Sequence, residues 1–226
     1  MESVREHPQC ILSVASTRTE ELEEVHTYLH REGLHQVLLT DNLATLAAHC
    51  DAVIDFTAPE YSMEIATTCV GHNTIFICGT TGFSAAQEAD LANLSSQLRL
   101  IKSANFSIGV NLLISLTKQV AATLGTDYDI EITDIHHRYK KDAPSGTALA
   151  LGEAAAAGRG VKLAKVADRD RDGMTGERNC GAIGFHALRG GDVIGDHTVL
   201  FAGEGERLEL THKSSNRTIY AAGALR

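Results

Sequence analysis

Short apolar runs alternate with amphipathic stretches along the first hundred residues. The runs are rich in β-branched residues, which indicates buried strands, and the stretches between them place apolar residues at helical spacing. The predicted strands are Cys10–Ser16, Val37–Leu39, Ala52–Phe56, Thr74–Cys78 and Leu100–Lys102. The predicted helices are Thr19–Arg31, Leu43–His49, Ser62–Gly71 and Ala85–Leu98. Strands that alternate with crossover helices are typical of an open parallel α/β sheet.

The second part of the chain has a different pattern. Two helices are predicted, at Ile108–Leu124 and Pro144–Ala157. The predicted strands are Tyr128–His136, Ala182–Leu188, Val193–Ala202 and Arg207–Lys213. Because Gly-rich turns separate runs of alternating character, we expect a mainly antiparallel sheet with one face covered. We therefore predict an α/β domain of residues 1–107 and 217–226 and an α+β domain of residues 108–216, with the boundary near Asn105–Gly109.

Composition and charge narrow the class of protein. The 226 residues carry a formal net charge of −9, which argues against nucleic acid or an anionic membrane as a partner. No apolar window reaches the roughly 18 residues of a membrane span, and the first residues lack the apolar core of a signal peptide. The five cysteines are widely spaced without a C-x-x-C pair, so we expect buried free thiols in a reducing compartment and a cytoplasmic location. His26 and His30 are four residues apart, but nothing completes a metal site, and we expect none.

Ligand-type residues follow three successive strands of the predicted parallel sheet. They are the segments Asp55–Pro59, Gly79–Phe83 (GTTGF) and Ser103–Ser107. Ligands of open α/β sheets bind beyond the carboxyl ends of the strands, where glycine lets the backbone approach and Thr or Asn side chains donate hydrogen bonds. The GTTG sequence alone could equally be a simple strand-to-helix turn. Three such ends together favour a binding site.

The segment His136–Thr147 carries the strongest chemical signal. Five of its first six residues can be positively charged in a chain that is acidic overall, and such crowding is unfavourable unless an anion offsets it. Pro144–Thr147 then opens a helix, whose free N–H groups and positive dipole end favour carboxylates. The combination suits a substrate with more than one carboxylate, and Lys or His here could transfer a proton. The alternative is a solvated basic turn before a capped helix.

The sequence HHRYKKDAPSGTA (residues 136–148) resembles the signature of the dihydrodipicolinate reductase family. VIDFT, GTTGF, ANFSIGVN, TGER, GDVIGDHTV and ERLELTHK also match, in the family's order. The resemblance implies a Rossmann-like cofactor domain and a substrate domain whose sheet assembles a homotetramer. It also implies reduction of dihydrodipicolinate, or its hydroxylated precursor, to tetrahydrodipicolinate with NADH or NADPH, in lysine and diaminopimelate biosynthesis.

The resemblance assigns roles to individual residues. His136 matches a proton donor or acceptor, Lys140 matches the proton donor, and His137, Gly146 and Thr147 match substrate contacts. The cofactor positions are Phe56, Gly79, Thr80, Thr81, Ser103, Ala104, Asn105 and Phe106. At Thr17–Arg18 the family often has an acidic residue before Arg. Because an acid there binds the ribose of NADH and an Arg takes the 2′-phosphate of NADPH, Arg18 favours NADPH.

The chain departs from the family pattern at both ends. No G-x-x-G-x-x-G loop precedes Cys10, and the family continues beyond the position of Arg226. We therefore expect a truncated cofactor domain beside an intact substrate domain. An alternative to an active reductase is a non-catalytic or cofactor-impaired homologue that keeps the substrate domain and the oligomer. A further alternative is another Rossmann-type reductase that acts on a different small acid.

Overall fold

The computed structural model describes residues 1–169 and 171–226. The chain divides into two compact units. The first contains Met1–Ala104 with Ala224–Arg226, and the second contains Asn105–Gly223. Each unit has its own buried apolar cluster.

Parallel strands build the first unit, as the alternating pattern predicts. β1 (Val14–Ser16) pairs with β2 (Leu38–Thr40), while β3 (Ala52–Asp55), β4 (Ile75–Cys78) and β5 (Leu100–Lys102) form a separate sheet in that order. The parallel sheet is thus in two parts among the described residues, where β1 and β3 each pair with one strand only, as fits a truncated Rossmann-like domain. The helices are α1 (Glu2–Glu6), η1 (Thr19–Glu21), α2 (Leu22–Arg31), α3 (Leu43–Ala48), α4 (Pro59–His72) and α5 (Ala85–Leu94).

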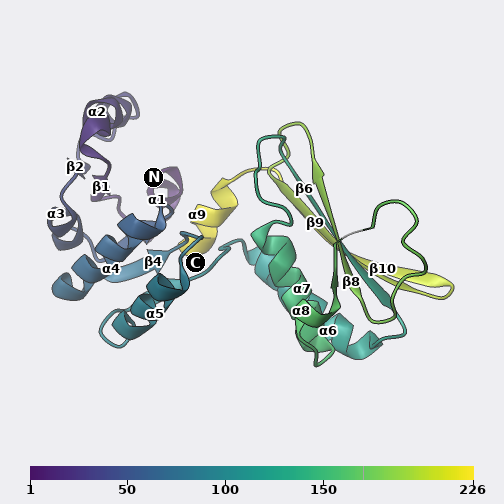
Figure 1. Cartoon of the computed structure of the whole chain (residues 1–226). Helices are drawn as coiled ribbons and strands as arrows, with labels where there is room; N and C mark the ends of the chain where they lie inside the picture. Colours follow the sequence, from purple (N-terminus) through teal and green to yellow (C-terminus); the bar gives the residue numbers. More distant parts are fainter. Residues whose placement is uncertain (170) are drawn as a thin grey trace. The chain divides into compact units, whose positions relative to one another are not determined.

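A five-stranded sheet with helices on one face forms most of the second unit (Figure 1). Its strands are β6 (Asp129–His136), β7 (Ala167–Asp168), β8 (Ile183–Arg189), β9 (Gly195–Gly203) and β10 (Glu206–Ser214), in the order β10-β9-β6-β8-β7. The helices are α6 (Ile108–Leu124), α7 (Gly146–Gly158), α8 (Leu163–Val166) and α9 (Thr218–Ala224).

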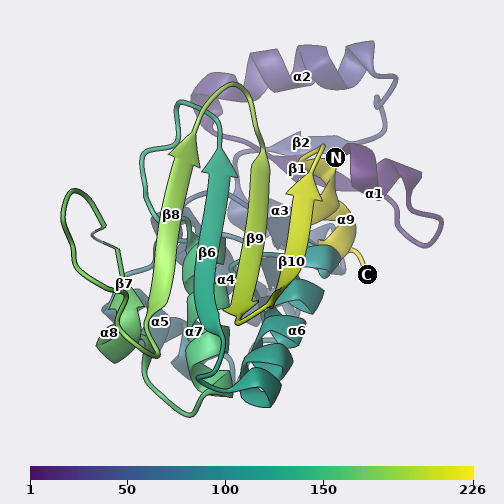
Figure 2. The same cartoon turned by 90° about the vertical axis from the view of Figure 1, so that its right-hand side faces the viewer.

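The sheet is mixed, which qualifies the expectation of antiparallel pairing. β9 pairs antiparallel with both β6 and β10, as expected, but β8 lies parallel to β6. Helix α7 lies between β6 and β8 in the chain and returns it to the same end of the sheet. A strand that follows such a crossover helix runs parallel to the strand before it. Figure 2 shows the face of this sheet opposite α6 and α7.

Small residues let α6 and α7 pack closely against each other and the sheet. A Cβ on Gly158 would lie 2.3 Å from the Lys118 carbonyl oxygen of α6, and one on Gly152 would lie 2.4 Å from the Phe185 ring of β8. Ile130 and Ile132 of β6 complete this core without measurable exposure. The rigid contact fixes the start of α7 against the end of β6. No helix among the described residues is long and apolar enough to cross a membrane.

Candidate active site

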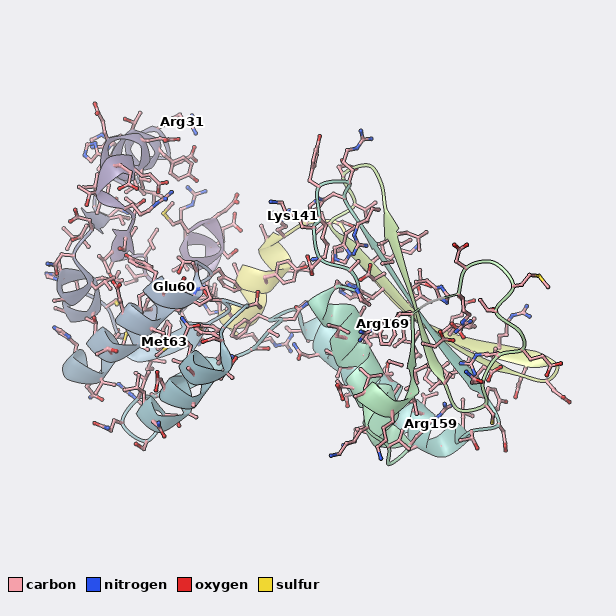
Figure 3. The ribbon with its side chains drawn as sticks, in the orientation of Figure 1. Arg31, Glu60, Met63, Lys141, Arg159 and Arg169 are labelled. Atoms are coloured by element: carbon pink, nitrogen blue, oxygen red, sulfur yellow. The ribbon has the colours of Figure 1, made fainter. Side chains whose placement is uncertain are left out.

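The loop 137–145 joins the end of β6 to the start of α7 and carries the basic cluster found in the sequence. Lys141, labelled in Figure 3, lies on this loop. Ser145 caps α7, since its hydroxyl accepts a hydrogen bond from the Ala148 N–H at 3.2 Å. Gly146 is exposed, and a Cβ there would meet no described atom within 4 Å. The start of α7 is therefore open beside Gly146, and a helix N-terminus of this kind can bind an anion.

A buried carboxylate lies beneath this helix terminus. Asp134 of β6 is 1% exposed and accepts hydrogen bonds from the Ser145 N–H at 2.5 Å and from Arg189 Nη1 at 2.6 Å. Its Oδ1 is also 3.7 Å from His136 Nδ1. Burial alone would raise the pKa of the Asp134 carboxyl, but interactions with His136, Arg189 and Ser145 outweigh it and hold that pKa below its ordinary value. Asp134 is therefore a permanent anion in the folded protein.

Two histidines lie together near this carboxylate. His136 and His197 are 8% and 4% exposed, and their ring centroids are 5.1 Å apart in an edge-to-face arrangement. His197 Nε2 lies 3.2 Å from the Ser145 hydroxyl oxygen. Burial, reinforced by the nearby charge of His136, lowers the pKa of His197 to about 4. His197 is consequently a neutral ring at physiological pH.

Two further cationic groups occupy the same end of the sheet. Lys140 Nζ donates to Asp142 Oδ1 at 2.9 Å, and this ammonium lowers the pKa of the Asp142 carboxyl. Arg217, which lies between β10 and α9, places Nη2 3.5 Å from His137 Nε2. The site thus concentrates ammonium, guanidinium and imidazole groups beside a helix N-terminus, which suits a ligand with several carboxylates.

A chain of hydrogen bonds connects the starts of α6 and α7. Asn105 Nδ2 donates to Thr147 Oγ1 at 3.1 Å, and Asn105 Oδ1 accepts from the Ser107 N–H at 2.8 Å. Ser107 caps α6, and its hydroxyl lies 3.4 Å from His212 Nε2. The segment that begins the second unit is therefore fixed to the first turn of α7.

The carboxyl ends of β3 and β4 in the first unit are organised by Asp55. This carboxylate is 2% exposed and accepts from the Thr57 N–H and hydroxyl, from Thr80 Oγ1 at 3.1 Å, and from Ser62 Oγ. Beside it, the Phe56 ring is 46% exposed and lies so close to Gly79 that a Cβ there would come within 2.1 Å of it. Glycine is thus required at position 79 for the ring to lie over the loop.

Models of one protein family match nearly the whole chain. The model described as "Dihydrodipicolinate reductase, N-terminus" matches residues 1–106, and the model described as "Dihydrodipicolinate reductase, C-terminus" matches residues 109–226. This chain belongs to the dihydrodipicolinate reductase family.

Individual relatives agree with the family models. The 4-hydroxy-tetrahydrodipicolinate reductase of Dinoroseobacter shibae is 53% identical over 190 residues, which cover 84% of this chain and 71% of the relative. The corresponding reductase of Ruegeria pomeroyi is 52% identical with the same coverage. The structure of dipicolinate-bound dihydrodipicolinate reductase from Paenisporosarcina sp. TG-14 is similar with a TM-score of 0.75 at 26% identity, over 99% of this chain and 85% of that chain.

The positions predicted from the dihydrodipicolinate reductase signature fall into both units. The second unit holds His136, His137, Lys140, Gly146, Thr147, Asn105 and Phe106. The first holds Arg18, Phe56, Gly79, Thr80, Thr81, Ser103 and Ala104. Thr80 is buried against Asp55, whereas Thr81 is exposed. Arg18 is bound by Glu21 and lies 3.6 Å from Glu20.

Four residues of this site were not predicted from the sequence: Asp134, Arg189, His197 and Arg217. GDHTV, which contains His197, matches the family pattern but indicates no role for the histidine. The two-residue repeat of a strand is the signal for two of them, because it places Asp134 and His197 on the buried faces of β6 and β9. Arg189 and Arg217 carry no such signal, since their partners are distant in the sequence.

Proposed function

We propose that this chain reduces dihydrodipicolinate, or its hydroxylated precursor, to tetrahydrodipicolinate with a nicotinamide cofactor, in lysine and diaminopimelate biosynthesis. The observation that carries the proposal is the open N-terminus of α7 at Gly146, directly after a loop of basic residues. The names of the reductase relatives, and the dipicolinate bound to the similar reductase from Paenisporosarcina sp. TG-14, support this substrate class.

The chain's own groups would bind the two carboxylates of the substrate. The free N–H groups of Gly146 and Thr147 would take one of them at the end of α7. His137 and Arg217, with side-chain nitrogens 3.5 Å apart, would bind the other through charge-assisted hydrogen bonds. Binding would also offset the repulsion among these cationic groups, which gives the dianion an advantage over neutral ligands.

Lys140 would donate the proton of the reaction. Its ammonium has three N–H donors, of which one is directed to Asp142 in this structure. The other donors would point to the substrate carbon that acquires negative charge. The bound nicotinamide would supply the hydride. His136, 3.7 Å from the Asp134 carboxylate, would position the substrate and exchange a proton with it.

The residues of the first unit fit the nicotinamide end of such a cofactor. Phe56 offers an exposed aromatic face at the carboxyl end of β3, where its ring lies against Gly79. We place the ring of the cofactor with Gly79–Thr81, Ser103 and Ala104 of this unit, and we assign Asn105 and Phe106, which follow in the chain, to cofactor binding as well. Of the two nucleotides we favour NADPH, since Arg18 could bind its 2′-phosphate after exchange from Glu21.

A pair of neighbouring lysines provides the test. Lys140→Ala should lower kcat about 10²–10⁴-fold, the usual contribution of a general acid, in an assay that follows NADPH oxidation. Lys141→Ala is the matched control on the same loop and should stay within about threefold of the unsubstituted chain, because Lys141 is exposed. Equal activities of Lys140→Ala and the unsubstituted chain would refute the proton-donor role.

Calorimetry separates the proposed reductase from a homologue that has lost its cofactor. Pyridine-2,6-dicarboxylate should bind to the second unit, and NADPH or NADH should bind to the same preparation. Binding of the dicarboxylate without either nucleotide would refute catalysis by this chain. A chain that bound nucleotide but not the dicarboxylate would instead act on another acid.

We also propose that the open face of the second unit's sheet assembles a homotetramer. Thr133, Thr198 and Thr211 form a polar row across β6, β9 and β10 on the face seen in Figure 2, and two of their hydroxyls are 3.0 Å apart. Light scattering tests the assembly, and a monomer at all concentrations would refute it. The five cysteines are free thiols, which supports the cytoplasm as the location. The expectation that all of them are buried is wrong, since only Cys69 and Cys78 are buried and Cys180 is exposed.

A further inference from the structure

Arg189 occupies a central position among the groups assigned to the reaction. It is the last residue of β8 and lies opposite His136 in the parallel register of β6 and β8. Its Nη1 donates to Asp134 Oδ1 at 2.6 Å, and its Nη2 donates to the backbone carbonyl of Asp142 at 2.8 Å. One guanidinium therefore joins the buried floor of the site to the loop above it.

The two ends of this bridge lead to different proton-handling groups. Through Asp134 it reaches His136, at 3.7 Å, and the N–H of Ser145 that begins α7. Through Asp142 it reaches Lys140, whose ammonium is held by the Asp142 carboxylate at 2.9 Å. His136 and Lys140 are thus connected by a continuous network of hydrogen bonds and ion contacts that passes through Arg189.

The geometry requires a guanidinium and not merely a positive charge. The Asp134 carboxylate and the Asp142 carbonyl bind different terminal nitrogens of the same planar group, and Nη1 also donates to the Leu188 carbonyl at 2.6 Å. A lysine ammonium could neutralise Asp134, but it is a single point of charge at the end of a flexible stem and lacks the fixed fork. Lysine at position 189 would therefore keep the charge balance of the buried site and release the Asp142 loop.

We propose that Arg189 is a positioning residue that holds His136 and Lys140 in register for the reaction. The inference rests on the proposed reductase function, and it adds a group that the sequence did not indicate. Arg189 does not contact substrate in this scheme. Its role is to fix the loop that carries Lys140 relative to the strand that carries His136, since small misplacements of catalytic groups cost up to about 10²-fold in rate.

Arg178 is a closely matched control for a purely structural contribution. Its side chain is 19% exposed, the same as that of Arg189, and it also donates to carboxylates of β6, those of Asp129 and Glu131. It likewise binds backbone carbonyls, those of Ile130 and Ala182. However, it lies at the opposite end of β6. Arg178→Lys should therefore disturb the sheet about as much as Arg189→Lys without touching the site.

Steady-state kinetics with NADPH would test the proposal on three chains: unsubstituted, Arg189→Lys and Arg178→Lys. We expect Arg189→Lys to lower kcat about 10–100-fold while the Kd of pyridine-2,6-dicarboxylate, measured by calorimetry, changes less than about threefold. Arg178→Lys should keep kcat within about threefold. In Arg189→Ala, millimolar guanidinium should restore part of the lost kcat, and it should not stimulate Arg178→Ala.

The outcomes distinguish failure of the proposed reductase function from failure of the proposed role of Arg189. An unsubstituted chain without turnover overturns the proposed function, and this inference with it. An active chain whose Arg189→Lys variant keeps its kcat, or whose Arg178→Lys variant loses as much, overturns the role of Arg189 alone. If the Arg189 variants do not fold, Asp142→Asn tests the same network. The Asp142 side chain is 62% exposed, so its replacement should be tolerated, and the backbone carbonyl at this position can still accept from Arg189. That variant should lower kcat several-fold, and an unchanged kcat overturns the link to Lys140.

Discussion

The substitution His197→Gln tests how the burial of a neutral imidazole makes the second unit sensitive to acid. His197 is 4% exposed, and burial lowers its pKa from the ordinary 6.5 to about 4. The unfolded chain therefore binds a proton between these values that the folded chain does not. The stability that depends on neutral His197 is therefore fully present above about pH 6.5, and it is lost progressively as the pH falls toward about 4.

The gap between the two pKa values sets the size of the effect. At about 1.4 kcal/mol for each pH unit, His197 alone should remove about 3 kcal/mol from the free energy of unfolding over this range. Asp134 acts in a different window. Because its pKa is held below the ordinary 3.8, its contribution is present above about pH 4 and is lost only at lower pH.

Urea denaturation between pH 7 and pH 4 measures this loss, and hydrogen exchange of β9 peptides assigns it to the second unit. His197→Gln keeps a neutral polar group beside Ser145. Between pH 7 and pH 4 this variant should lose about 3 kcal/mol less of its free energy of unfolding than the unsubstituted chain. His186→Gln leaves His197 in place and should retain the loss, since the His186 side chain is 42% exposed on the other face of the sheet. A His197→Gln variant that loses as much stability as the unsubstituted chain would refute the reasoning.

Two further substitutions concern the first unit. The amide in Asp55→Asn cannot accept all the hydrogen bonds that the carboxylate receives from Thr57, Ser62 and Thr80. Urea denaturation should therefore show a free energy of unfolding lower by about 1–3 kcal/mol. A decrease below about 0.5 kcal/mol would contradict this reasoning. Glu21→Gln removes the ion-pair partner of Arg18 and a negative charge beside the proposed 2′-phosphate site. Calorimetry should therefore show that NADPH binds several-fold more tightly while the affinity for NADH is unchanged. Equal effects on the two nucleotides would contradict the assignment of Arg18.

Most elements could be predicted from the sequence because their periodicity is local. Ile108–Leu124 and Leu100–Lys102 have the predicted bounds, and the remaining predicted helices and strands differ mainly at their ends. The parallel pairing of β8 with β6 could not be predicted from its alternation, because the same pattern serves either direction of pairing. The direction of β8 depends instead on the crossover through Gly146–Gly158, which reverses the chain before β8 begins.

The buried residues of the site were hard to predict because polar residues continue the apolar two-residue repeat of β6. Ile130 and Ile132 are buried, and continuing their two-residue repeat places Asp134 and His136 on the same face. Ile135 draws attention to the other face, where it is only half-buried. A carboxylate is also an unexpected core residue unless its partner is known, and that partner, Arg189, is 55 residues away. Long-range ion pairs of this kind are set by the fold and not by local sequence.

The separate small sheets of the first unit have a consequence for handling the protein. β1 and β3 each leave one side without a strand among the described residues, and an unpaired strand edge can template aggregation if it pairs with another copy. The two strands are only three and four residues long, which limits the strength of such pairing. Open-ended association of this type grows steadily with concentration, whereas a closed tetramer reaches a fixed mass. A dilution series can therefore tell the two apart before any kinetic measurement is interpreted.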